Sequence, residues 1–118
     1  MRARVKMLYS PDIVPDLEKW KPESPDFGFL IEADIGPVGE EGTNIFQFMV
    51  CTPQWFADHL MTGPITSGRH TLFVKNYDHD LHKRYIEQAV ESCEADDWGS
   101  LAQQLQVLGA WEFHNYRA

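Results

Sequence analysis

The chain begins with a segment in which apolar and polar residues alternate, as they do in a half-buried strand. Val5, Met7 and Tyr9 are expected on one face of this strand, and Arg4 and Lys6 on the other. We therefore predict an N-terminal strand whose apolar face includes Met7 and Tyr9.

Residues 10–26 contain four prolines, which deny the segment regular structure and predict a long loop. Loops of this length in small domains often carry function. Trp20 lies in this loop between two lysines, and exposed aromatic residues are enriched as anchors at binding sites. Two interpretations stay open: Trp20 folds back on the domain, or it anchors a partner.

Two more alternating segments, residues 27–35 and 43–52, predict strands that pair as a hairpin. The glycine-rich connection between them has an acidic tip formed by Glu40 and Glu41. This connection lacks the Gly-Lys-Ser/Thr ending of a phosphate-binding loop, and its charge repels phosphate. The hairpin therefore predicts an acidic tip and no phosphate-binding loop.

The second half of the chain changes to helical periodicity, with apolar residues three and four positions apart. Residues that cap helix starts, and glycines or prolines that end helices, divide this half into elements. The elements predicted here are a short helix from Pro53 that Gly63-Pro64 stops, a strand over 69–75, a helix from Asp78 or Asp80 with an apolar stripe of Leu81, Tyr85, Ala89 and Cys93 flanked by Ile86 and Val90, a helix after Asp97 that ends at Gly109, and a final strand through Trp111 and Phe113.

This order of elements, with strands early and helices mostly late, predicts an α+β fold. We expect an antiparallel or mixed sheet of about five strands, with about three helices that mostly cover one face. The 118 residues, of which 43% are hydrophobic, are enough for one core, so a single domain over residues 1–118 is expected. One sheet face is expected to carry Arg4, Lys6, Glu32, Asp34, Glu112 and His114.

The net charge of −8 makes nucleic acid and anionic membranes poor partners, because the chain repels phosphates. Such a charge suits a basic protein partner. The alternative is that the charge only keeps the protein soluble and monomeric. The sequence shows no signal-peptide core and no membrane-spanning run, so the cytoplasm is the expected location.

Cysteines and histidines are the residues in this chain that could hold a metal or form a disulfide. Cys51 and Cys93 both lie among apolar residues and are interpreted as small buried hydrophobes, with a disulfide as the alternative. His79 and His82 could share a helical face near His70, but a zinc site needs three or four ligands. We interpret these histidines as solvated and predict no metal and no cofactor.

Glu32 and Asp34 lie two residues apart on one predicted strand, so both side chains reach the same side. Hydrolases use pairs of carboxylates at a suitable separation. No pocket signature accompanies this pair, so a solvated strand face is favoured and a partner-binding face comes second. No enzyme is predicted.

Several short segments, taken in their order and spacing, resemble the immunity protein 8 family of small bacterial proteins, which are described as neutralising a cognate toxin. The resemblance extends over nearly the whole chain. The segments that carry it are Leu8-Tyr9-Ser10-Pro11-Asp12, Phe27-Gly28-Phe29, Ile35-Gly36-Pro37 with Gly39-Glu40-Glu41-Gly42, Phe46, Phe48, Val50-Cys51-Thr52-Pro53 with Trp55, Arg69-His70, Tyr77-Asp78, Ser92-Cys93-Glu94, and Trp111-Glu112-Phe113 with Tyr116.

The resemblance implies an α+β protein that acts by binding, encoded beside a toxin. The leading hypothesis is an immunity protein that masks the active site of a cognate toxin, or a nearby surface, with a basic nuclease as one possible toxin. The alternatives are an interaction module without a toxin and, less favoured, a small metal- or carboxylate-dependent hydrolase. A monomer or weak homodimer is expected, since an exposed first or last strand could pair two copies. The candidate partner-binding residues are Trp20, Glu32, Asp34, Glu40 and Glu41.

Overall fold

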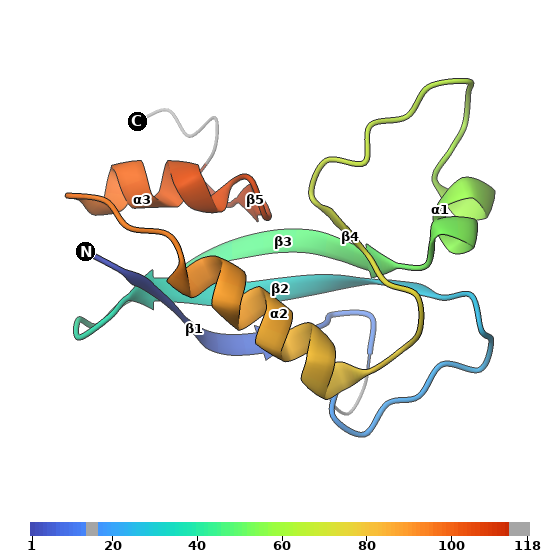
Figure 1. Cartoon of the computed structure of the whole chain (residues 1–118), viewed down its shortest axis with the longest axis horizontal. Coiled ribbons are helices and arrows are strands. Elements are labelled where there is room, and N and C mark those ends of the chain that lie inside the picture. Colours follow the sequence, from blue (N-terminus) through green and yellow to red (C-terminus); the bar gives the residue numbers. More distant parts are fainter. Residues whose placement is uncertain (14–16, 114–118) are drawn as a thin grey trace.

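The computed structural model describes residues 1–13 and 17–113. Its strands form one mixed, open sheet, and helices pack against that sheet (Figure 1). The strand order is β1-β2-β3-β4, and β5 pairs with β3 on the same side as β4. All pairings are antiparallel except that of β3 with β4. The elements are β1 (Ala3–Tyr9), β2 (Gly28–Pro37), β3 (Asn44–Cys51), α1 (Pro53–His59), β4 (Thr71–Phe73), α2 (His79–Glu91), α3 (Trp98–Leu105) and β5 (Ala110–Trp111).

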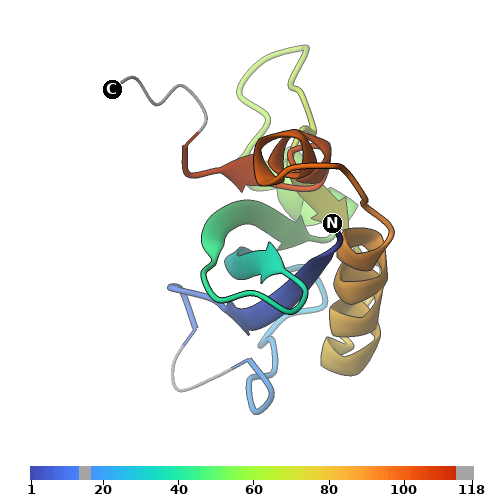
Figure 2. The same cartoon turned by 90° about the vertical axis from the view of Figure 1, so that its left-hand side faces the viewer.

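The helices α2 and α3 pack on one side of this sheet. Figure 2 shows α2 against one face of the twisted sheet and α3 beside β5 at its edge. Among the described residues, no helix covers the opposite face of β1, β2 and β3 except at its Gly28 end, where the ring of Trp55 in α1 packs, and we call this face the open face. The predicted α+β class and the mixed sheet of about five strands are confirmed. The described side chains on the open face include Met7, Tyr9, Glu32, Asp34, Gln47 and Glu112.

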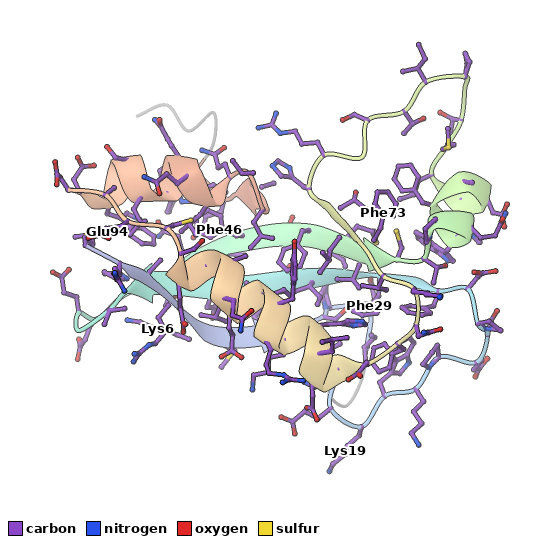
Figure 3. All side chains as sticks on the ribbon, viewed as in Figure 1. Lys6, Lys19, Phe29, Phe46, Phe73 and Glu94 are labelled. Carbon is purple, nitrogen blue, oxygen red and sulfur yellow. The ribbon has the colours of Figure 1, made fainter. Side chains whose placement is uncertain are left out.

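The core lies between the sheet and the helices α2 and α3. Alternate residues of β2 and β3 are buried, as the period-two pattern predicts. Phe46 lies near α3 and Phe29 near the start of α2 (Figure 3). The buried core side chains of these four elements are Phe29, Ile31, Ala33, Ile35, Phe46, Phe48, Val50, Ile86, Val90, Leu101, Ala102 and Leu105.

β1 contains a β-bulge at Lys6, which the alternation of the sequence does not reveal. Val5 and Met7 pair with consecutive residues of β2, so Lys6 is an extra residue in β1. Because side chains alternate with period two, the extra residue moves the later side chains of β1 to the other face. Met7 is 57% exposed, and Tyr9 also faces the open side. The expectation that Val5, Met7 and Tyr9 share one face is therefore wrong.

The inward face of α2 also differs from the predicted apolar stripe. His82, Ile86 and Val90 point into the core, whereas Leu81 and Tyr85 are exposed. The buried residues recur every four positions, as a helix face requires, but the series begins one residue later than predicted. The prediction placed Leu81 and Tyr85 inward because they are apolar. The residue that actually begins the buried series, His82, is polar, so hydropathy alone does not mark it as a core residue.

His82 is 8% exposed, so the expectation that the helix-start histidines are solvated is wrong for this residue. Its ring packs edge-on against Tyr77, with the ring centroids 5.8 Å apart. Burial lowers the pKa of His82, and this shift is only partly opposed by the hydrogen bond with the Asn76 backbone and by the charge of Asp78. The neutral imidazole therefore contributes an apolar surface to the core.

Three predicted elements are shorter than expected. β4 has three residues instead of 69–75, because only Met49 to Cys51 of β3 pair with it. The last helix ends at Leu105, before the predicted end at Gly109. β5 ends before Phe113, and His114 lies outside the described residues.

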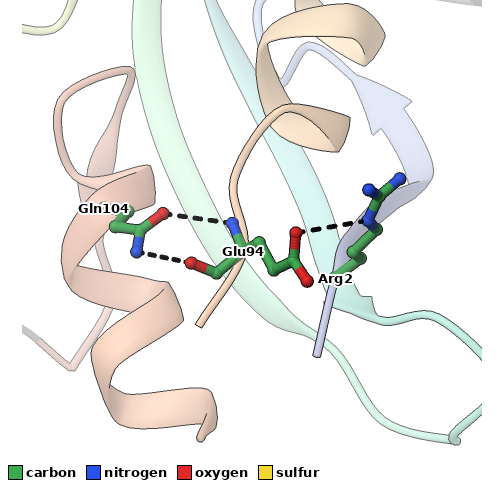
Figure 4. A network of polar contacts seen from close by, with 3 residues as sticks. All are labelled: Arg2, Glu94 and Gln104. Carbon is green, nitrogen blue, oxygen red and sulfur yellow. Dashed lines mark hydrogen bonds and ion pairs between the residues drawn. The ribbon is translucent and has the colours of Figure 1, made fainter. Parts of the chain in front are cut away.

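The N-terminus of β1 is joined to the link between α2 and α3 near Glu94. The Gln104 side chain donates to the Glu94 carbonyl at 2.7 Å and accepts from the Glu94 amide at 3.2 Å (Figure 4). The Glu94 carboxylate lies 3.7 Å from the Arg2 guanidinium, in an exposed ion pair. Exposed pairs contribute little to stability, so the N-terminus is attached mainly by the backbone, where the Ala95 amide donates to the Met1 carbonyl at 3.1 Å. The two hydrogen bonds of Gln104 attach the same link to α3.

Asn44, at the start of β3, connects two tryptophans from the C-terminal elements. Its side-chain oxygen accepts the indole N–H of Trp98 at 2.6 Å and that of Trp111 at 3.1 Å. Both tryptophans are half-buried and pack against the core. One amide oxygen therefore holds α3 and β5 on the same end of β3.

Replacement of Asn44 by alanine tests this connection. We expect Asn44→Ala to lower the free energy of unfolding by about 1–3 kcal/mol, because two half-buried indole N–H groups lose their acceptor. Urea denaturation followed by tryptophan fluorescence measures the change. The control is Thr43→Ala at the exposed neighbouring position, which should change stability little. Equal stabilities of the two variants would contradict the role of Asn44.

Candidate partner-binding face

Glu32 on β2 is held at both carboxylate oxygens by neighbours on the open face. The Tyr9 hydroxyl donates to one oxygen at 2.7 Å, and the Gln47 side-chain amide donates to the other at 2.9 Å. Tyr9 and Gln47 are the residues that pair with Glu32 in the two neighbouring strands. Three adjacent strands therefore fix the position of one carboxylate.

Tyr9 has an unusually stable hydroxyl proton in this arrangement. Its hydrogen bond to Glu32 is the main reason that its pKa is raised to about 12. Burial and the nearby charges of Asp34 and Glu112 act in the same direction. The hydroxyl thus remains a donor to Glu32 throughout the neutral pH range.

Two further carboxylates lie close to Glu32. Asp34 is on the same face of β2, and Glu112 follows β5. The Glu112 carboxylate accepts from the Ile45 amide at 2.8 Å, and the Glu112 amide donates to the Ile45 carbonyl at 3.0 Å. Burial raises the pKa of Asp34, and the charges of Glu112 and Glu32 raise it further. The open face therefore holds three like charges close enough to affect one another.

The tip of the β2–β3 hairpin carries the exposed residues Glu40 and Glu41. The Lys6 ammonium donates to the backbone carbonyls of Glu40 and Gly42, so the bulge residue of β1 is attached to this tip. A Cβ atom on Gly36 would lie 2.1 Å from the Gly42 carbonyl oxygen, so the close return of the loop requires glycine at this position. The acidic tip is thus held at the end of β1 and β2.

Trp20 folds back on the domain, one of the two interpretations left open by the sequence. It is half-buried, and its ring meets Phe29 and Tyr77 edge-on, with centroids 5.3 and 5.0 Å apart. Phe29 points to the core side of β2, opposite to Glu32. The structure therefore brings Glu32 and Asp34 together but leaves Trp20 away from them.

Sequence reasoning missed the two residues that position Glu32. Tyr9 could not be found, because the bulge at Lys6 gives no sign in the alternation of β1. Gln47 could have been found by counting outward from the hairpin turn, since the paired register places it opposite Glu32. Glu112 was expected on this face and is present there.

The cysteines and the remaining histidines show no cluster with Glu32. Both cysteines are free thiols, and Cys51 is buried as expected, whereas Cys93 is only half-buried. The His70 ring nitrogen donates to the Gln106 carbonyl at 2.7 Å. Within residues 1–13 and 17–113, no three His, Cys, Asp or Glu side chains are arranged to hold a metal ion. No helix in this described part is long and apolar enough to cross a membrane.

In comparison with known proteins, one protein family matches almost the whole chain. No curated protein and no solved structure matches the chain. Residues 3–116 match the family described as Immunity protein 8. The match includes all strands and helices described above, and it suggests a non-enzymatic role. The chain belongs to the Immunity protein 8 family.

Proposed function

We propose that this protein neutralises a cognate toxin by binding it through the open face of the sheet, and so masks the active site of the toxin or a surface beside it. Family membership supports an immunity protein. The observation that carries the choice of surface is the cluster of Glu32, Asp34 and Glu112 on the open face, in which hydrogen bonds hold Glu32 and Glu112 in place.

Fixed carboxylates make this face suitable for binding. Tyr9 and Gln47 hold Glu32, and the Ile45 amide holds Glu112, so these side chains lose little freedom when a partner binds. Binding surfaces whose groups are already ordered lose less affinity to conformational entropy.

The repulsion among Glu32, Asp34 and Glu112 also destabilises the free protein. The raised pKa of Asp34 shows that its ionised form is disfavoured in the fold. Natural proteins retain locally unfavourable arrangements mainly at sites where function requires them. Lysine and arginine side chains of a basic toxin would relieve the repulsion on binding.

A nuclease toxin suits this chemistry best. Its nucleic-acid site needs lysines and arginines that neutralise phosphates. The carboxylates of the open face would occupy the same cations, while the net charge of −8 would repel nucleic acid and steer the toxin toward the complex. The hairpin tip with Glu40 and Glu41 would extend this surface, whereas Trp20 is not part of it.

Because the ionised Asp34 carboxylate destabilises the fold, we expect Asp34→Asn to stabilise the free protein at pH 7. A carboxyl whose pKa is raised by folding destabilises the native state fully above that raised pKa, and the effect disappears as the pH falls to its ordinary value of 3.8. Urea denaturation of both proteins from pH 7 to pH 4 should therefore show a difference that shrinks with acidity. A variant that is less stable than the natural protein at pH 7 would contradict the account.

The role of the open face in binding is tested with Glu32→Gln/Asp34→Asn and the toxin domain encoded beside this gene. We expect dissociation to be about tenfold faster or more, because charge-assisted contacts are lost, and we expect the rescue of growth to weaken. Surface plasmon resonance measures the rates. The matched control, Glu91→Gln/Asp96→Asn, removes two exposed carboxylates outside the strands of the open face and should leave dissociation unchanged. Equal rates for both variants would exclude this face.

Charge reversal at the hairpin tip should act mainly on association. In Glu40→Lys/Glu41→Lys we expect a slower association rate with a flatter dependence on salt, because the tip steers the toxin from a distance. Stopped-flow mixing at several salt concentrations measures both quantities. An unchanged association rate would remove the tip from the binding surface.

A further inference from the structure

The surface near β4 differs in charge from the rest of this acidic chain. No aspartate or glutamate occurs in residues 59–77, which include Arg69 and Lys75. Large apolar side chains are exposed beside this segment: Tyr85 is 56% exposed and Val107 87%. Apolar residues that gather on a surface, rather than being scattered singly, indicate an interaction site.

A groove of about 540 Å³ lies among these residues, between segment 68–72, α2 and the C-terminal end of α3. We call it the α2–α3 groove. Its apolar lining includes Leu72, Tyr85, Ala89 and Leu108, and it has no acidic residue in its described lining. Arg69 supplies the only side chain there with a permanent charge among the described residues. The groove is therefore apolar with one cation.

Segment 68–72 is held rigidly at this groove by His70. His70 has a φ of 58°, and it is the only described residue other than glycine with a positive φ. Its ring donates to the Gln106 carbonyl at the end of α3, and its own carbonyl accepts from the Met49 amide at 2.9 Å. Non-glycine residues keep this backbone conformation only where their surroundings hold them, and such positions are frequent at binding sites.

We propose that the α2–α3 groove is a second protein-binding surface, and that it receives a partner segment with apolar side chains next to a carboxylate. The apolar side chains would pack against Leu72, Tyr85 and Leu108, and the carboxylate would pair with Arg69. Within the described part of the chain, no carboxylate forms an ion pair with the Arg69 guanidinium. Tyrosine and arginine are also the residue types that most often dominate binding energy.

A second copy of the chain fits this groove less well than a different protein does. In a symmetric dimer the same patch faces itself, and the groove has no acidic residue to meet Arg69 of the other copy. The groove also lies on the helix-covered side of the sheet, away from the open face. Its occupant is therefore independent of the toxin contact proposed above.

Selection from a displayed library of random twelve-residue peptides on the immobilised full chain tests the proposal. We expect enriched peptides to carry apolar residues beside aspartate or glutamate. Binding of the selected peptides, measured by fluorescence anisotropy, should weaken about tenfold or more in Arg69→Glu and in Tyr85→Ala, since a charged contact and an aromatic anchor are lost. Both side chains are exposed, so the fold should persist, as circular dichroism can verify.

Two control variants locate the binding. Arg84→Glu makes the same charge change as Arg69→Glu on the outer face of α2 and should leave peptide affinity unchanged. Glu32→Gln/Asp34→Asn should also bind the peptides normally, even if toxin binding fails, so the two proposals can fail separately. The proposal is overturned if no peptides are enriched, if the enriched peptides are basic, or if Arg69→Glu binds them as well as the natural protein does. Self-association that Arg69→Glu or Tyr85→Ala abolishes would assign the groove to a second copy instead.

Discussion

The extra residue at Lys6 in β1 is the constraint on which the open face depends. Without the bulge, Tyr9 would face the core side and could not hold Glu32. The bulge also directs Lys6 to the carbonyls of Glu40 and Gly42, which places the acidic hairpin tip beside the same face. One inserted residue thus organises both acidic regions of the molecule.

The same face shows a conflict between stability and binding. The Asp34 carboxyl is partly buried and lies near two other carboxylates, which raises its pKa and so favours its protonated form. The core beneath it has no such conflict, since Phe46, Phe48 and Ile35 are almost fully buried among apolar neighbours. Packing of that core maintains the sheet, and the sheet holds the carboxylates together despite their repulsion.

Period-two alternation predicted β2 and β3 correctly, because both strands bury every second residue against helices. It failed where a local irregularity changed the phase, as at Lys6, or where a buried polar ring replaced an apolar residue, as at His82. Glu32 and Asp34 could be placed on one strand face from their spacing. The approach of Glu112 from the far end of the chain depends on the pairing of β5 with β3, which no local pattern contains.

Methionine methyl groups offer the most direct test of the open face as the toxin contact. Met7 lies on the open face beside Asp34, whereas Met61 lies in the segment after α1, outside the strands that form that face. Spectra of protein labelled with ¹³C at the methionine methyls, recorded alone and with the toxin domain encoded beside this gene, report on both positions at once. The account predicts a changed Met7 signal and an unchanged Met61 signal. A tight complex that shifts Met61 and leaves Met7 unchanged would contradict it.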